Sequence, residues 1–153
     1  MKVNLLYGGS SISGYTNVDH LGLAEGAYHG NVCDLTEFVD DSEAIEILAV
    51  DVINFFNKNN ILSIIDHWVS KLRHGGKIII GAADAHCICK SFCEYDITIA
   101  EINSMLYGEE EPYIRKNAIT MMSLAYYLES NHGLKIIKKQ SIEYKILIEA
   151  ERL

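Results

Sequence analysis

The sequence has a single proline, Pro112, in 153 residues, and it has no low-complexity tract, internal repeat or evident linker. So few breaks predict one folded domain over residues 1–153, which is long enough to bury a real core. Apolar runs are short as well. None approaches the roughly 18 residues of a membrane span, so no membrane segment is expected. Met1 and Lys2 lead directly into an apolar strand, which is not the pattern of a signal peptide.

Positive charge is scarce, because 13 Lys and Arg residues stand against 21 Asp and Glu residues, for a net charge of −8. Binding to nucleic-acid phosphates needs a surplus of Lys and Arg on one face. We therefore expect no nucleic-acid partner. Small molecules and proteins remain open as partners, and the composition is compatible with a homodimer.

Cysteine is limited to four residues: Cys33, Cys87, Cys89 and Cys93. Their spacing does not suggest a secreted disulfide framework, so a reducing cytoplasmic location is expected. With His86, the last three resemble a metal-binding cluster. Cysteines that pack on a helix are the favoured interpretation, and we expect no metal.

The stretch Val3–Asp19 (VNLLYGGSSISGYTNVD) joins a strand-like run to a loop that contains glycine. Val3–Leu6 has the continuous apolar character of a buried strand, and Gly8 and Gly9 follow it. Glycine lets backbone approach a ligand closely because it has no Cβ. The next extended run ends in Asp19, whose carboxylate could accept hydrogen bonds from ribose hydroxyls. This pattern favours a nucleoside-binding edge, with a plain hairpin or turn as the structural alternative.

Two further segments predict a parallel sheet with a crossover helix. Ala44–Val50 and Lys77–Ile80 are apolar runs, and we expect them to lie parallel beside Val3–Leu6. Between them, apolar residues recur at helical spacing over residues 61–72. Trp68 lies on the apolar face of this helix, so its burial against the sheet is expected.

The ends of this helix carry local signals. Asn57–Asn60 is expected to supply the N-cap, and Gly75 and Gly76 to stop the helix. Arg73 and His74 then fall in or just after its last turn, where cations suit the helix dipole.

The last third of the chain predicts two helices and a hairpin. Cys89–Tyr107 is read as one helix, and a second runs from about Ala118 to Asn131. Leu134–Ile137 and Ile142–Ile148 are strands joined by a turn too short for a parallel crossover, so they pair antiparallel. The expected fold class is therefore α/β, with a mostly parallel sheet and an antiparallel C-terminal hairpin.

Four stretches resemble motifs of the compact class I S-adenosylmethionine (SAM)-dependent methyltransferases, whose Rossmann-like sheet ends in an antiparallel strand. They are Val3–Asp19, similar to LNLGCG…GYINVD; Asp40–Phe56, similar to DDS…EI.ASHVLEHF; Trp68–Ile80, similar to W.RVLKPGGKLYI; and Arg115–Thr120, similar to H+.AFT. The resemblance covers nearly the whole chain.

The resemblance implies that SAM is the cofactor and that the methyl acceptor is a small molecule or a glycan. It implies a ribose contact for Asp19 and a contact to the adenine amino group for Asp34. The full set of implied cofactor contacts is Asn4, Tyr7, Gly8, Gly9, Asp19, Asp34 and Asp51. Asp51 follows a buried strand and is the candidate general base, although methyl transfer can also proceed by positioning alone.

The chain departs from the family pattern at several cofactor-side positions. Leu6 and Tyr7 replace the first glycine and the cysteine of the glycine motif, His74 replaces a proline, and Phe55 and Arg115 replace histidines. A non-catalytic, methyltransferase-like protein that binds or interacts without turnover is therefore the main alternative. A nucleotide- or NAD-binding module is a third reading, but it lacks a G-x-G-x-x-G motif. Glu109–Glu111 is read as a solvated loop, with a lid over the substrate as the alternative.

Overall fold

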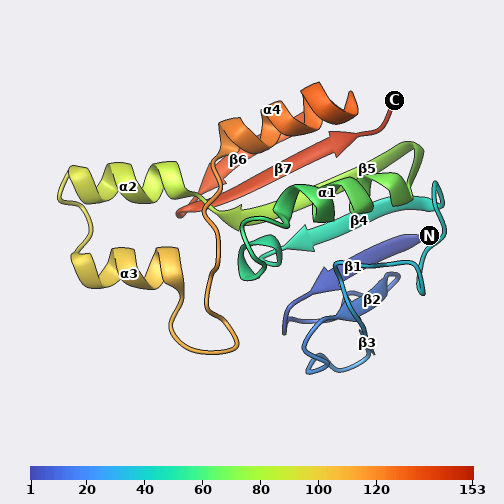
Figure 1. Ribbon diagram of the computed structural model, residues 1–153, viewed down its shortest axis with the longest axis horizontal. Helices are drawn as coiled ribbons and strands as arrows, with labels where there is room; N and C mark the ends of the chain where they lie inside the picture. Colours follow the sequence, from blue (N-terminus) through green and yellow to red (C-terminus); the bar gives the residue numbers. More distant parts are fainter.

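The computed structural model describes residues 1–153, and its framework is a seven-stranded sheet in the order β3-β2-β1-β4-β5-β7-β6 (Figure 1). The strands are β1 (Lys2–Leu6), β2 (Thr16–Asp19), β3 (Tyr28–His29), β4 (Ala44–Val50), β5 (Leu72–Ala83), β6 (Lys135–Ile142) and β7 (Lys145–Glu151). The first five are parallel, and β7 is antiparallel to both of its neighbours. This confirms the α/β fold expected from the sequence, with a mostly parallel sheet and an antiparallel C-terminal hairpin.

The three predicted central strands lie side by side and parallel, as expected. Val3 pairs with Ile47 and Ile47 pairs with Ile78, so the apolar runs form one continuous layer. β1 and β2 are also parallel, although no helix separates them. β2 has four residues, so the chain must return only about 13 Å, which the loop of residues 7–15 can span without a helix.

Two helices cover one face of the sheet: α1 (Ile61–Lys71) over β4 and β5, and α4 (Met121–His132) over β6 and β7 (Figure 1). Their apolar residues join the strands in a core of 27 buried side chains. Trp68 is fully buried there, as predicted, and its indole Nε1 donates to the Val32 carbonyl at 2.8 Å. Burial of such a side chain stabilises the fold by roughly 1.5–3 kcal/mol.

The predicted ends of α1 need correction. The helix ends at Lys71, and Leu72 is already extended and begins β5. Arg73 and His74 therefore lie in a strand, because the backbone turns before the two glycines. At the other end, Asn60 is the N-cap residue but makes no side-chain capping hydrogen bond. The Asn57 side chain instead accepts from the amide of Asn59 at 2.9 Å.

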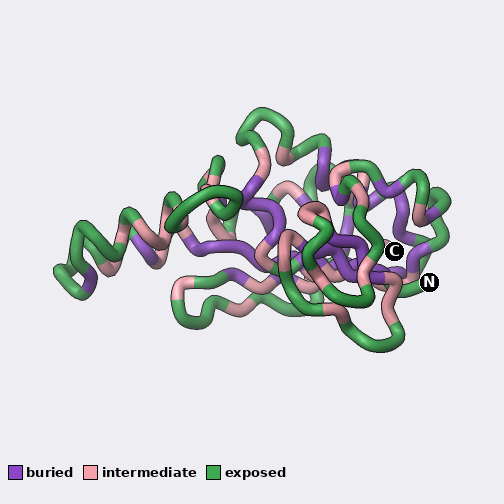
Figure 2. Tube along the Cα trace, turned by 90° about the horizontal axis from the view of Figure 1, so that it is seen from below, coloured by how far each residue is buried: buried purple, intermediate pink, exposed green.

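The single helix expected over Cys89–Tyr107 is two helices, α2 (Ala85–Cys93) and α3 (Ile99–Tyr107). Tyr95 has a φ of 62°, which ends the first helix, and Thr98 starts the second through a capping box with Glu101. The two helices pack through a small cluster of their own and project from the body of the molecule (Figures 1 and 2).

The C-terminal segment follows the prediction, with shifted boundaries. α4 ends at Gly133 in the left-handed conformation, as its glycine predicts. The β6–β7 turn falls at Glu143 and Tyr144, so Ile142 belongs to the first strand of the hairpin. None of the helices is both long and apolar enough to cross a membrane.

Candidate functional site

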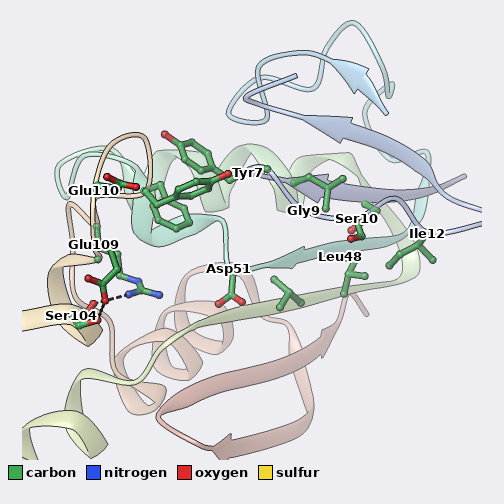
Figure 3. Close-up of a pocket in the computed structure, with 17 residues that line it drawn as sticks. Tyr7, Gly9, Ser10, Ile12, Leu48, Asp51, Ser104, Glu109 and Glu110 are labelled. Carbon is green, nitrogen blue, oxygen red and sulfur yellow. Dashed lines mark hydrogen bonds between the residues drawn. The ribbon is translucent and has the colours of Figure 1, made fainter. Parts of the chain in front are cut away.

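A cavity of about 850 Å³ opens at the carboxyl ends of β1 and β4 (Figure 3). The chain leaves β1 toward β2 on one side, and β4 lies on the other side, so this is the point where the strand order reverses. Ligands of open α/β sheets bind at such a point. The cavity is lined by Asn4, Leu6, Tyr7, Gly8, Gly9, Ser10, Ile12, Leu48, Val50, Asp51, Phe55, Ser104, Gly108, Glu109, Glu110, Tyr113 and Arg115.

The glycine loop is held tightly at its first residue. Gly8 has a φ of 67°, and a Cβ placed on it would lie 2.4 Å from the Tyr113 hydroxyl. Only glycine fits there without displacing the tyrosine. The Gly8 amide donates to Asp19 Oδ1 at 2.8 Å, which fixes the loop to the end of β2.

Asp19 is fully buried and does not line the cavity. Its Oδ1 accepts from the amides of Gly8 and Leu21, at 2.8 and 3.1 Å, and its Oδ2 accepts from those of Leu23 and Ala24, each at 2.8 Å. Burial alone would raise the pKa of Asp19, but the hydrogen bonds from these backbone amides outweigh that effect, so the pKa lies below its ordinary value. With four donors already in place, the carboxylate has no lone pair left for a ribose hydroxyl.

An aromatic stack forms one wall of the cavity. The ring centroids of Tyr7 and Phe55 lie 4.5 Å apart with an interplanar angle of 13°. The His20 ring also stacks on Tyr7, with a centroid distance of 5.5 Å. Tyr113 meets Tyr7 edge-on at 6.2 Å. Burial raises the pKa of Tyr7, with help from the nearby Glu111 carboxylate, and burial lowers the pKa of His20. Both side chains are therefore neutral at pH 7.

Asp51 lies at the end of β4 with a φ of 56°, and its side chain points into the cavity (Figure 3). Its amide donates to the Gly81 carbonyl at 3.1 Å, which anchors this unusual backbone conformation. Its carboxylate is 39% exposed and accepts from Lys145 Nζ at 2.9 Å. A carboxylate that is both accessible and oriented by a cation can accept a proton from a bound ligand.

The far wall is acidic. Glu109 and Glu110 line it, and the Ser104 hydroxyl donates to Glu109 (Figure 3). Arg115 is the cation of this wall, and its Nη1 donates to the Met105 carbonyl at 2.9 Å. Together with Asp51, the lining therefore holds three carboxylates against one guanidinium.

Comparison with solved structures places this geometry in a known fold. No family model matches the sequence, and no curated protein matches it either. An O-methyltransferase family protein from Burkholderia thailandensis superposes on 99% of this chain with a TM-score of 0.60 and 15% identity. This chain covers 50% of that protein, so it spans about half its length.

Two methyltransferases with bound S-adenosylhomocysteine (SAH) also match. The 1,6-didemethyltoxoflavin-N1-methyltransferase of B. thailandensis gives a TM-score of 0.58 at 10% identity, over 99% of this chain and 71% of that one. The magnesium protoporphyrin IX methyltransferase of Synechocystis PCC 6803 gives 0.61 at 12% identity, over 99% and 74%. This chain has the class I methyltransferase fold.

Within the methyltransferase fold, the candidate residues separate into two groups. Asn4, Tyr7, Gly8, Gly9 and Asp51 all line the cavity. Asn4 is buried, and its Nδ2 donates to Asn17 Oδ1 at 2.8 Å, so it also joins β1 to β2.

Asp34 lies outside the cavity, on the loop after β3. Its side chain is 63% exposed and accepts from the amide and hydroxyl of Thr36. These bonds, the hydroxyl first, lower the pKa of Asp34. Like the ribose role of Asp19, its adenine role remains a prediction.

No three His, Cys, Asp or Glu side chains are grouped so that they could hold a metal ion. Cys89 and Cys93 are exposed, in contrast to the buried packing expected for them. Cys87 lies 3.4 Å from the Ser141 hydroxyl, and that hydroxyl donates to the buried Asp84 at 2.6 Å. Burial raises the pKa of Cys33 to about 11.

Several lining residues were not predicted. The family resemblance gives Phe55 and Arg115 only as replacements of histidines, and no sequence pattern indicates Tyr113 or Ser104. Their chain positions lie between about 50 and 110 residues from the glycine loop, so no local pattern connects them.

Proposed function

We propose that this protein is a SAM-dependent methyltransferase that acts on a small molecule or a glycan. The observation that carries the proposal is the 850 Å³ cavity at the strand-order reversal of a class I methyltransferase fold. Neighbours with this fold are described with SAM or SAH, and an O-methyltransferase from neocarzinostatin biosynthesis is described in complex with SAM and 2-hydroxy-5-methyl naphthoic acid. A non-catalytic role is not favoured by any of these matches.

The lining suits a cofactor that is flat at one end and cationic at the other. Ligand cavities generally span about 300–1,000 Å³, so the volume is ample for a cofactor with a small acceptor. The stacked rings of Tyr7 and Phe55 offer an aromatic surface. Three carboxylates stand against one guanidinium, and Lys145 pairs with one of them, so the site keeps a negative charge that favours a sulfonium cation and opposes a pyrophosphate. The NAD-binding reading loses support for the same reason.

Within this proposal, Gly8, Gly9, Asn4 and Tyr7 surround the cofactor, and bound SAM supplies an electrophilic methyl group. Asp51 is the proposed general base, because its accessible carboxylate lies on the cavity wall. It would take a proton from an acceptor hydroxyl or amine, and Lys145 would hold it in place. Asp19 would bind the ribose only when a ribose hydroxyl replaces one of the four backbone N–H groups that donate to its carboxylate.

The test is isothermal titration of the full chain with SAM, SAH and NAD. We expect SAM to bind and NAD not to bind. Asp51→Asn should weaken SAM a few-fold more than it weakens SAH, which lacks the sulfonium charge, as about 1 kcal/mol of partly exposed charge attraction requires.

Asp96→Asn is the matched control, because it removes the same charge from an exposed loop outside the cavity. Absence of SAM binding by the folded parent protein would refute the proposal. SAM binding without methylation of any acceptor would instead favour the non-catalytic alternative.

A further inference from the structure

The face of the sheet opposite α1 and α4 has no helix over it. Leu48, Ile79 and Leu147 alternate with the buried residues Ile47, Ile80 and Ile148, so they point to this opposite face. All three are partly exposed, and Val50 beside them is 39% exposed. Central parallel strands are normally covered on both faces. Within residues 1–153, this face of the sheet is therefore only partly covered.

We define the open sheet face as the side chains on this side of β4, β5 and β7. They are Glu46, Leu48, Val50, Lys77, Ile79, Leu147, Glu149 and Glu151. The loop of residues 7–15 lies over the β1 side and reaches β4 at Glu46, whose carboxylate accepts from the Tyr15 hydroxyl and lies 3.7 Å from Lys2 Nζ.

Charges alternate in a row across this surface. The strand register places Lys2 beside Glu46, Glu46 beside Lys77, and Lys77 beside Glu151. Directly paired residues point to the same face, and the ion pair between Lys77 Nζ and Glu149 Oε1 at 3.0 Å agrees with that. Those four charges cancel, and Glu149 beside them brings the total to −1, on a chain whose net charge is −8. Two copies can therefore approach each other here with less repulsion than the charge of the whole chain would cause.

The same register makes the surface complementary to itself. A two-fold axis parallel to the strands, between β4 and β5, would bring Glu46 against Lys77 of a second copy. The next row would bring Leu48 against Ile79 of that copy, because these two residues are neighbours in the register. A two-fold axis across the strands would set the charged row against apolar side chains or, if it ran through that row, against the same charges of the second copy. Only the axis parallel to the strands therefore sets apolar side chains against apolar side chains and each charge against an opposite charge.

We propose that the open sheet face is a homodimer interface, with two sheets packed face to face around this axis. Packed sheets keep their strands within about 30° of each other, which preserves the pairing of the central rows. Leu48 and Val50 also line the cavity, so the second copy would close that side of it.

The experiment measures molar mass by sedimentation equilibrium for the parent chain and for Lys77→Glu. We expect the parent to be a dimer. Lys77→Glu should raise the dimer dissociation constant at least about tenfold, because it sets two pairs of like charges against each other. Combined with Glu46→Lys, the substitution should restore the dimer, since the reversed pairs again attract.

Lys58→Glu makes the same charge change on an exposed loop away from this surface and should leave the dimer intact. Circular dichroism checks that each variant is folded, and Ile79→Ser is a second, uncharged disruption should a charge variant unfold. A monomeric parent, a Lys77→Glu variant that still dimerises like the parent, or a folded double variant that stays monomeric would each overturn the proposal.

Discussion

Replacement of Asp19 by asparagine should destabilise this protein strongly, although the two side chains have almost the same shape. The carboxylate accepts four backbone hydrogen bonds, two on each oxygen, and it is completely buried. Asparagine can accept two of these bonds through its oxygen. Its amide group would point N–H donors at the remaining two N–H donors, which have no other partner in the structure.

The expected loss follows from those two bonds. A hydrogen bond to a charged group contributes about 1.5–3 kcal/mol, so losing two costs roughly 3–6 kcal/mol before the loop relaxes. We expect a decrease of about 3 kcal/mol or more in the free energy of unfolding at pH 7. Domains of this kind are stable by only about 5–15 kcal/mol, so the effect is large.

The parent protein should also lose this stabilisation in acid. The pKa of Asp19 in the folded protein is lowered, because its hydrogen bonds from backbone amides outweigh the effect of desolvation. In the unfolded chain its pKa is about 3.9. Stability from this group is therefore fully present above the unfolded pKa and is lost as the pH falls through the folded pKa. The Asp19→Asn variant lacks the group and should lose less stability below pH of about 4.

Guanidinium unfolding at pH 7 and at several acidic pH values measures both effects. Asp34→Asn is the matched control, because that exposed side chain accepts hydrogen bonds only from Thr36, and its one other charged neighbour is His67 at 3.7 Å. Equal unfolding free energies for the parent and Asp19→Asn at pH 7 would show that the four hydrogen bonds to Asp19 do not stabilise the fold.

Three further predictions concern the core and the cysteines. Trp68→Phe should lower the free energy of unfolding by about 1–3 kcal/mol, because it leaves the Val32 carbonyl without its buried donor. In the parent, the buried indole should resist polar fluorescence quenchers, and ready quenching would contradict its burial. Asn54→Ala should cost about 2–4 kcal/mol by removing buried hydrogen bonds to the Ala83 amide and the Asn117 side chain, and a thermal melt equal to the parent's would refute this. Protein purified without added metal should contain no stoichiometric zinc, which elemental analysis can contradict.

The sequence determined the central sheet through short-range regularity. Continuous apolar runs identified β1, β4 and β5, and helical spacing identified α1 and the burial of Trp68. These patterns are reliable because each element must bury one face, whatever surrounds it. The helix break after Cys93 was also encoded locally, in the capping pair Thr98 and Glu101, but the apolar spacing on either side concealed it.

The tertiary structure decided the site. Gly8, Gly9 and Asp51 could be placed at one edge because the carboxyl ends of parallel strands meet there. Phe55 and Tyr113 could not, since only folding brings the short 3-10 helix Ile53–Phe55 and the distant loop of Tyr113 onto Tyr7. The sequence determined that Asp19 ends a strand beside the glycine loop. Its surroundings were decided by a loop that folds back and turns three further amides toward the carboxylate, because a buried charge requires donors from wherever the chain can supply them.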